Sequence, residues 1–550
     1  MSPDPNEIRS LVGEYVGNRI DRRQFLSRAL ALGLSATAAG GLLAACSSSS
    51  SSPSAATSTK PPTTTLTYRP LVDMQNLDPA FWVSQDDGIL FDCIYEGLVT
   101  FRPGTFQVVN NLAESFEPSA DGLRYHFTLK KGIEWQKGYG EVRASDVKFS
   151  YERIAGLTQP KLNSPYSGDW SALETVQVTG PYEGTIILKQ PFAPIMHSTL
   201  PASSGKVLPQ KAVEGLGKSF ATNPVGSGPY EFVSWVPKQH AILKRFDRYS
   251  GANKSFAAKA PWETIETQVI ASDNTAFAAA QTGSVAFAYI PPSLVSQAQH
   301  SSSLKVYSRP TLNYYFLSIS QKNVPNIDVR RAIRSAIDVP GVIKAAYAGR
   351  YQRAYGIIPQ SMGIGYWAAA PRYNQDLTLA KQYLARSGMK NVSLTLTVVN
   401  TQSDEAAAQV IAANLQQIGI KVKIQPEDSA TFDAIPGNGG GGPHRDLVYS
   451  LFVTEPDPYW SFIWFTCAQV GVWNWTDWCG QQFNSTLNQA LKTYNVPDRD
   501  RLYNSASKLW DEEANIVWIA YPTWYYATQP WVRPSLRPDG YPILWNTTAM

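Results

Sequence analysis

The residues best suited to bind an organic molecule are concentrated in one short segment of this 550-residue chain. Between Thr454 and Trp478 the sequence holds eight aromatic residues, and five of them are tryptophan. Rigid aromatic faces stack on sugars, rings and alkylammonium groups, and a nearby carboxylate adds charge complementarity. We predict that the following residues contact a ligand: Trp82, Thr454, Glu455, Asp457, Trp460, Trp473, Asn474 and Trp475.

Two other interpretations of this segment stay open at this point. The rings can form the core of a lobe, with Asp457 capping a turn or a helix. Alternatively, Glu455 and Asp457 can be the paired carboxylates of an exported glycosidase. These two residues flank Pro456, however, and cannot be assumed to face one gap of the roughly 5–9 Å that such enzymes need. No Gly-x-Ser-x-Gly motif indicates another hydrolase, and we expect no catalytic residue.

Composition argues against several further functions. The chain has 48 Lys and Arg against 44 Asp and Glu, and a net charge of +4 is too weak for a nucleic-acid partner. Its four Cys and five His form no metal-ligand spacing, so we expect neither a metal nor a cofactor. The glycine run between Asn438 and Pro443 lacks a following Gly-Lys-Ser/Thr and predicts a loop without a phosphate site.

The first 45 residues are predicted to be an export signal. Arg22 and Arg23 precede an apolar stretch of small residues at 29–45, which ends in Leu-Ala-Ala followed by Cys46. The arginine pair resembles a twin-arginine signal and the ending resembles a bacterial lipobox, which implies that Cys46 carries a lipid. The alternative is a permanent transmembrane helix, for which a stretch of 17 residues is at the short limit.

Residues 46–65 are predicted to be a tether because they are rich in serine and proline and cannot bury apolar surface. The remainder would face an extracytoplasmic space, where disulfides persist. Cys467 and Cys479 are therefore a candidate bridge that closes a short loop. Cys93 lies on an apolar helical stripe and is expected to be a buried, unreactive thiol.

The elements that must position the aromatic segment differ between the two halves of the chain. In the first half, Tyr125, Phe127 and Leu129 alternate with polar residues and predict a strand. Residues 228–235 and 240–244 predict a hairpin.

In the second half, apolar residues from Val329 to Ile337 recur with helical spacing, and we expect Asp328 to cap that helix. A strand at 392–400, a helix containing Val410 to Ile418 and a strand from Ile420 then predict a parallel β-α-β unit. The apolar strand at 516–520 is expected to return the chain to the first lobe. These patterns predict an α/β protein with two lobes.

Several motifs resemble, in the same order, the solute-binding proteins of ABC importers in the family 5 group, which includes oligopeptide, dipeptide and nickel binders. The similarity spans about 66 to 530. The motifs are Leu77-Asp78-Pro79, 95–99, 112–117, 121–132, 144–150, 224–230, 281–283, 328–338 and 414–422.

This resemblance implies a periplasmic-binding-protein fold of type II, with an extra subdomain in the first lobe and a ligand cleft between the lobes. The expected parts are a signal at 1–45, a tether at 46–65, a first lobe at 66–309, a second lobe at 310–515 and a C-terminal return at 516–550. We expect a monomer that is lipid-anchored to the outer face of the cell membrane. It would deliver a small organic solute to an ABC permease and its ATPase.

The sequence also departs from the family pattern. Peptide binders of this family tend to carry an Asp about three residues before Asp-Pro, where it pairs with the ligand's α-ammonium, and Thr454 stands at that position here. Oligopeptides therefore rank level with sugars, polyamines and opine-like amines. A sensor subunit or a chaperone-like scaffold on the same fold is a further alternative.

Overall fold

The computed structural model describes residues 24, 27–28, 63–249, 260–432 and 445–550. The chain divides into two units, residues 1–59 and 60–550, and all the sheets described below belong to the second. Cys46 and the glycine run lie outside the described residues. Of the predicted signal peptide, only residues 24, 27 and 28 are described. Within the described residues, no helix combines the length and apolar character needed to span a bilayer.

A seven-stranded mixed sheet forms the centre of the first lobe, in the order β12-β19-β11-β1-β10-β9-β8. Strand β1 is parallel to both of its neighbours, and β8 and β9 form the hairpin that the sequence predicts. The strands are β1 Thr65–Arg69, β8 Tyr230–Val236, β9 His240–Arg245, β10 Thr264–Gln268, β11 Phe287–Tyr289, β12 Lys305–Pro310 and β19 Thr523–Thr528.

A four-stranded antiparallel sheet, ordered β4-β5-β7-β6, lies between β1 and β8 in the sequence. Tyr125, Phe127 and Leu129 of β5 are buried, as their alternation predicts. Its elements are β4 Ala113–Pro118, β5 Arg124–Leu129, β6 Leu173–Gly180, β7 Glu183–Leu188 and the helix α5 Ala144–Ile154; a small pair, β2 Val99–Phe101 and β3 Val108–Asn110, precedes them.

The second lobe contains a six-stranded sheet in the order β14-β18-β13-β17-β15-β16. Strands β15 and β16 are parallel and are joined through α12 (Gln402–Gln416), which confirms the predicted β-α-β unit. Gly419 turns the chain between them with φ of 86°, a conformation that a side chain would strain. The strands are β13 Tyr314–Ile319, β14 Gln352–Arg353, β15 Ser393–Val399, β16 Lys421–Glu427, β17 Leu447–Phe452 and β18 Ile516–Tyr521.

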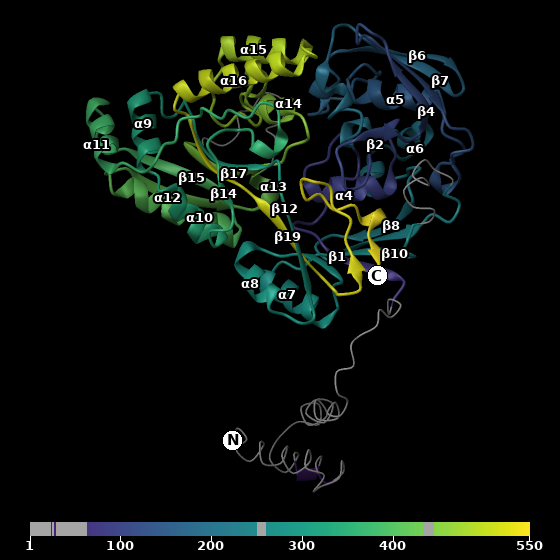
Figure 1. Cartoon of the computed structure of the whole chain (residues 1–550), viewed down its shortest axis with the longest axis horizontal. Helices are drawn as coiled ribbons and strands as arrows, with labels where there is room; N and C mark the ends of the chain where they lie inside the picture. The colour runs from purple at the N-terminus through teal and green to yellow at the C-terminus, as the bar shows by residue number, and fades with distance from the viewer. Residues whose placement is uncertain (1–23, 25–26, 29–62, 250–259, 433–444) are drawn as a thin grey trace. The chain divides into compact units, whose positions relative to one another are not determined.

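In the same lobe, α10 (Val339–Tyr347) packs against α12, and α11 (Leu377–Arg386) packs against α9 (Ile327–Ala336) (Figure 1). Helix α9 buries Val329 and Ile333, as its spacing predicts. The predicted cap was wrong, however. The helix begins one residue before Asp328, so the Asn326 side chain accepts the hydrogen bonds from the first free N–H groups.

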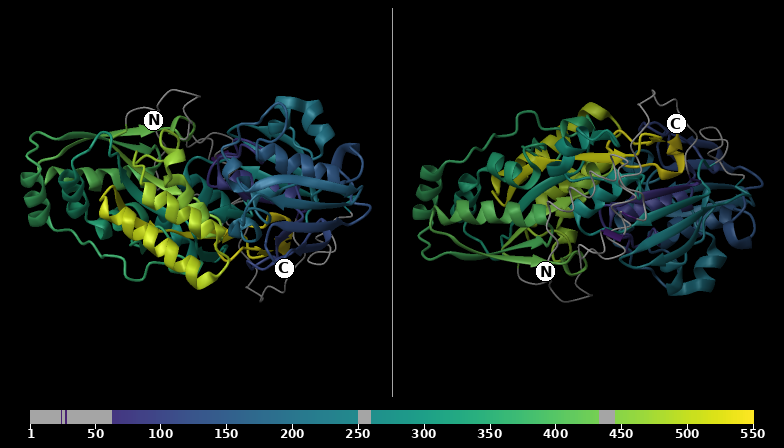
Figure 2. Two further views of the ribbon diagram at one scale, coloured as in Figure 1. Left: turned by 90° about the horizontal axis from the view of Figure 1, so that it is seen from above. Right: turned by 90° about the horizontal axis from the view of Figure 1, so that it is seen from below.

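The chain passes between the large sheets at two places, after β12 and after β18. Strand β18 pairs with β13 in the six-stranded sheet, whereas β19 pairs with β11 and β12 in the seven-stranded sheet. The strand predicted to return the chain to the first lobe therefore stays in the second, and the crossing is made at Pro522. In both views of Figure 2, the green region with the six-stranded sheet and the blue region with the four-stranded sheet lie at opposite ends of the second unit.

The aromatic segment lies between β17 and a pair of long helices. It contains α14 (Pro458–Phe462) and leads into α15 (Gln481–Lys492) and α16 (Val496–Glu512), which lie side by side (Figure 1). Tyr494, between these helices, hydrogen-bonds the hydroxyl of Tyr125 in the four-stranded sheet at 3.2 Å. The connection between α15 and α16 thus contacts the extra sheet of the first lobe.

Candidate ligand-binding site

A cavity of about 810 Å³ has walls from both large sheets. The first lobe supplies Arg69 at the end of β1, the start of α4 (Gln85–Ile94), Tyr289 of β11 and Trp524 of β19. The second lobe supplies Tyr315 of β13, Tyr347 of α10, the segment 399–404 and residues 450–453 at the end of β17. Several of these positions follow the carboxyl ends of strands, where open α/β sheets place ligands.

Tryptophan and tyrosine rings form one end of this cavity. Trp82 and Tyr166 of the first lobe stack almost parallel to each other, with centroids 5.2 Å apart. Tyr166 also stacks on Trp460 of the second lobe at 5.8 Å, so that rings from both lobes meet here. Trp464 and Trp473 continue the wall with an edge-to-face contact at 4.8 Å.

Half of the predicted ligand residues border this cavity: Trp82, Trp460, Trp473 and Trp475. Trp473 and Trp475 are partly exposed, whereas Trp82 and Trp460 are buried. The two partly exposed rings lie on the cavity side, and Asn474 between them is buried and does not border the cavity. The rings of Trp473 and Trp475 are thus the predicted residues most open to the cavity.

Asp457, also predicted as a ligand residue, does not border the large cavity. Its side chain is 2% exposed and forms two 2.7 Å hydrogen bonds to the Arg499 guanidinium. It also accepts a hydrogen bond from the Tyr459 backbone N–H and caps α14. Because both oxygens are occupied inside the protein, Asp457 has the capping role that the sequence left open as an alternative.

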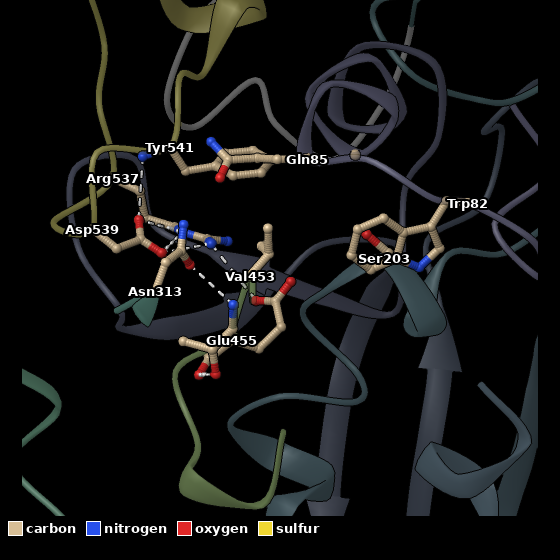
Figure 3. Close-up of a pocket in the computed structure, with 11 residues that line it drawn as sticks. Trp82, Gln85, Ser203, Asn313, Val453, Glu455, Arg537, Asp539 and Tyr541 are labelled. Atoms are coloured by element: carbon tan, nitrogen blue, oxygen red, sulfur yellow. Dashed lines mark hydrogen bonds and ion pairs between the residues drawn. The ribbon is translucent and has the colours of Figure 1, made fainter. Parts of the chain in front are cut away.

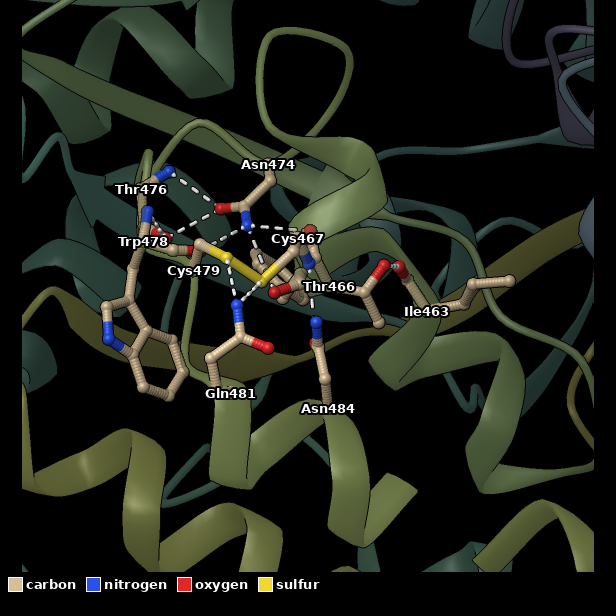
Figure 4. Close-up of a disulfide and its surroundings, with 10 residues drawn as sticks. Ile463, Thr466, Cys467, Asn474, Thr476, Trp478, Cys479, Gln481 and Asn484 are labelled. Carbon is tan, nitrogen blue, oxygen red and sulfur yellow. Dashed lines mark hydrogen bonds between the residues drawn. A yellow bond between two sulfur atoms is a disulfide. The ribbon is translucent and has the colours of Figure 1, made fainter. Parts of the chain in front are cut away.

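Asn474 is likewise a structural residue. Its side-chain amide donates to the backbone oxygens of Phe465, Thr466 and Trp478, and its carbonyl oxygen accepts from Thr476 (Figure 4). These bonds hold together the loop that the disulfide between Cys467 and Cys479 closes. The polar groups of Asn474 are therefore used within the loop, on a side chain that does not border the large cavity.

Thr454 and Glu455 border a separate, much smaller pocket beside Trp82 (Figure 3). The Thr454 hydroxyl is 2.7 Å from that of Ser461. The Glu455 carboxylate lies 3.6 Å from the Arg537 guanidinium, which pairs more closely with Asp539 at 2.7 Å. Burial raises the pKa of Glu455 to about 7, against the opposing effect of Arg537.

The hydrolase interpretation has no support in this geometry. Asp457 is held by Arg499 and Glu455 faces Arg537, so each acidic residue of the suggested pair is oriented by its own arginine. Neither residue borders the large cavity. Two carboxylates placed in this way cannot flank a glycosidic bond bound between the lobes.

Two buried carboxyl groups that the sequence did not single out border the cavity, Asp86 and Asp404. Burial raises the pKa of each to about 7. Asp86 accepts a 2.9 Å hydrogen bond from the Val72 backbone N–H. Asp404 lies in the first turn of α12, directly after β15, and its Oδ1 has no hydrogen-bond partner. Its position after a strand of the predicted β-α-β unit was the signal that could have found it.

The remaining charges at the cavity belong to an ion pair. Arg69 is buried and donates to Asp273 at 2.8 Å and to the backbone oxygens of Ile270 and Tyr289. Among the described residues, no group of three or more His, Cys, Asp or Glu side chains could hold a metal ion. The cavity therefore offers aromatic faces and a few fixed charges, which suits an organic molecule.

Comparison with known proteins agrees with this fold. The Helicobacter pylori periplasmic binding protein DppA, solved with the peptide STSA, matches with a TM-score of 0.79 at 23% identity and covers 88% of this chain and 98% of its own. The protein MoaA from A. tumefaciens R10, solved with mannopinic acid, matches at 0.77 and 23%, covering 88% and 99%. These likenesses confirm the predicted two-lobed α/β fold.

Sequence comparison gives the family. The glutathione-binding protein GsiB of Shigella flexneri serotype 5b is 27% identical over 434 residues, which are 76% of this chain and 81% of that protein. The model of bacterial extracellular solute-binding proteins, family 5 Middle, matches residues 107–466. With its two-lobed fold and its aromatic cavity, this chain belongs to the bacterial extracellular solute-binding proteins of family 5.

Proposed function

We propose that this protein captures a small organic solute in the 810 Å³ cavity and delivers it to an ABC permease and its ATPase. The observation that carries the proposal is that both lobes supply aromatic walls to the same cavity, as in the stack of Tyr166 on Trp460. A ligand that contacts both lobes favours their closed arrangement by the difference in its affinity for the two states. Capture of this kind needs no covalent step.

The proposed division of the second unit follows the strands. The first lobe runs from residue 66 to Pro310, which pairs with Thr523 of β19, and the second lobe runs from β13 through β18. We move the last boundary from Ile516 to Pro522, because β18 pairs within the six-stranded sheet. The two linking segments around 311–313 and Pro522 are then the hinge about which the lobes close.

The proposed solute is peptide-like, an amine or a sugar. The name of GsiB supports a peptide-like compound, and the structures with the peptide STSA and with mannopinic acid show that this fold holds chemically different molecules. In this chain, tryptophan rings at one end of the cavity suit the apolar faces of any of these classes.

A thermal-shift screen of the purified full chain tests this function. One class of small organic solute should stabilise the protein by about 3 kcal/mol at a hundredfold excess over the dissociation constant. Chromatography of the same mixture should recover the solute unchanged. Product that accumulates with time would instead favour the hydrolase, and the absence of any stabilising solute, including those released from the purified protein, would contradict solute capture.

We further propose that the protein acts as a monomer held to the outer face of the cell membrane by lipid on Cys46. The Ser/Pro-rich tether would keep the binding unit close to its permease and raise its local concentration there. Cys46→Ala should move the protein from the membrane fraction to the soluble fraction. A Cys46→Ala protein that stays in the membrane would indicate that the apolar segment at 29–45 is a transmembrane anchor.

A further inference from the structure

Asp404 is an acidic group placed at the cavity without a complete set of partners. Its side chain is 92% buried, it borders the cavity, and its Oδ1 atom accepts no hydrogen bond. A buried carboxyl oxygen without a donor costs free energy that a ligand N–H can recover. The Thr401 and Tyr347 hydroxyls stabilise the Asp404 carboxylate but leave Oδ1 without a donor. The other buried carboxyl at the cavity, Asp86, differs because the Val72 N–H and the Tyr68 hydroxyl reach its two oxygens.

The surroundings of Asp404 are aromatic and carry no positive charge of their own. Tyr315, Tyr347 and Tyr351 pack against one another with centroids 4.3–6.2 Å apart, and all three border the cavity. Tyr289 borders the same cavity from the first lobe. Aromatic faces around a carboxylate form the kind of environment that attracts an organic cation.

Hydrogen-bond donors without partners lie at the first-lobe wall of the same cavity. The indole N–H groups of Trp82 and Trp524 are buried and unpaired in the structure. The residues that border the cavity therefore include one with an unpaired acceptor on the second lobe and two with unpaired donors on the first. A solute with a cationic nitrogen at one end and oxygen acceptors elsewhere would satisfy both and connect the lobes.

We infer that the solute carries an ammonium group that binds the Asp404 carboxylate beside Tyr289, Tyr315 and Tyr347. This inference rests on the proposed function and narrows its solute class to organic amines. Asp404 lies at the start of α12, which is distinct from the position before Asp-Pro where Thr454 stands.

The test compares amines with their N-acetylated forms, which have the same skeleton and no charge. 1,4-Diaminobutane, L-lysyl-L-alanine, D-glucosamine and the solutes released from the purified full chain are each offered before and after acetylation. Compounds that bind should do so as amines, and acetylation should weaken binding about tenfold or more, because a hydrogen bond to a charged group is lost. Isothermal titration gives the dissociation constants.

Two variants separate Asp404 from its neighbourhood. Asp404→Asn should weaken amine binding about tenfold or more. Glu405→Gln makes the same change at the next residue of α12, which does not border the cavity, and should alter binding less than about twofold. The unliganded melting temperature of Asp404→Asn should be no lower than that of the wild type, which shows that the weaker binding is not a folding defect.

The pH dependence of binding gives a readout that a purely structural residue would not change. Amine affinity should rise between pH 6 and 8 as Asp404 ionises, and Asp404→Asn should lose that part of the rise. The groups facing Asp404 are Tyr289, Tyr315, Tyr347 and Tyr449, whose pKa values burial raises above 10. Asp86 and the Arg69–Asp273 pair border the same cavity and are common to both proteins, so the difference between the two proteins reports on Asp404.

The outcomes distinguish this inference from the function on which it rests. Equal binding of acetylated and free compounds, or equal effects of Asp404→Asn and Glu405→Gln, would overturn the ammonium site while leaving solute capture intact. If neither the defined compounds nor the released solutes bind in any form, the proposed function fails and the inference fails with it.

Discussion

Asp457 and Asp404 are both buried acidic residues of the second lobe close to aromatic rings, yet they have different surroundings. Asp457 receives two hydrogen bonds from Arg499 and one from the chain, so its charge is balanced within the protein. Asp404 has an oxygen without a donor and borders the cavity. The difference teaches that an acidic residue beside aromatic rings in the sequence need not have a free charge, because the donors around each buried carboxyl group decide that.

The largest effect is expected when the arginine partner of Asp457 is removed, which tests whether the buried carboxylate needs its counter-charge. Arg499→Met leaves a buried carboxylate without its counter-charge, which typically costs about 3–5 kcal/mol of unfolding free energy. Chemical denaturation of the unliganded protein measures this loss. Lys508→Met, on the same helix α16 but without a described ion pair, serves as the control and should stay within about 0.5 kcal/mol. An Arg499→Met protein as stable as the wild type would show that Asp457 does not need its partner.

A second comparison tests whether the aromatic wall contributes to binding or to the core. Trp473→Ala should weaken the binding of a solute identified in the screen by about tenfold or more, because a stacking face is lost from the cavity. Trp367→Ala removes a tryptophan that is also partly exposed and does not border the cavity, so it should leave binding unchanged. Titration calorimetry measures both. If Trp473→Ala lowers the unliganded melting temperature and leaves affinity intact, the ring belongs to the core.

The smallest effect concerns pH and the stability of the unliganded protein. Burial raises the folded-state pKa of Asp404 from 3.8 to about 7, so the folded protein binds a proton more tightly than the unfolded chain does. The stabilisation that results from this pKa difference is fully present below about pH 4, and it is lost as the pH rises through 7. Lowering the pH from 8 to 6 should therefore stabilise the protein, by about 1 kcal/mol for this group.

Burial also raises the pKa values of Asp86, Asp169 and Glu455. These groups should therefore add to the gain in stability when the pH is lowered from 8 to 6. The Asp404→Asn variant isolates the contribution of Asp404. When the pH is lowered from 8 to 6, its unfolding free energy should increase less than that of the wild type. Identical pH profiles for the two proteins, measured by urea denaturation, would show that Asp404 does not change its protonation state between pH 8 and 6.

The sequence by itself determined the fold class and several local elements. The alternation of Tyr125, Phe127 and Leu129 and the β-α-β unit around α12 appear in the structure because patterns with periods of two and of 3.6 residues each bury one face. The motif order also placed the chain in its family. These features depend on neighbours in the chain, so the sequence carries them directly.

Only the tertiary structure decided which side chains face the cavity. Arg499 lies 42 residues from Asp457 in the sequence, and no local pattern joins the two; packing of α16 against α14 brings them together. Asp404 meets Tyr315 and Tyr347 in the same way, through strands and helices that are far apart in the chain. Whether a buried acid is free for a ligand depends on the donors that surround it in space, and a linear sequence does not contain that arrangement.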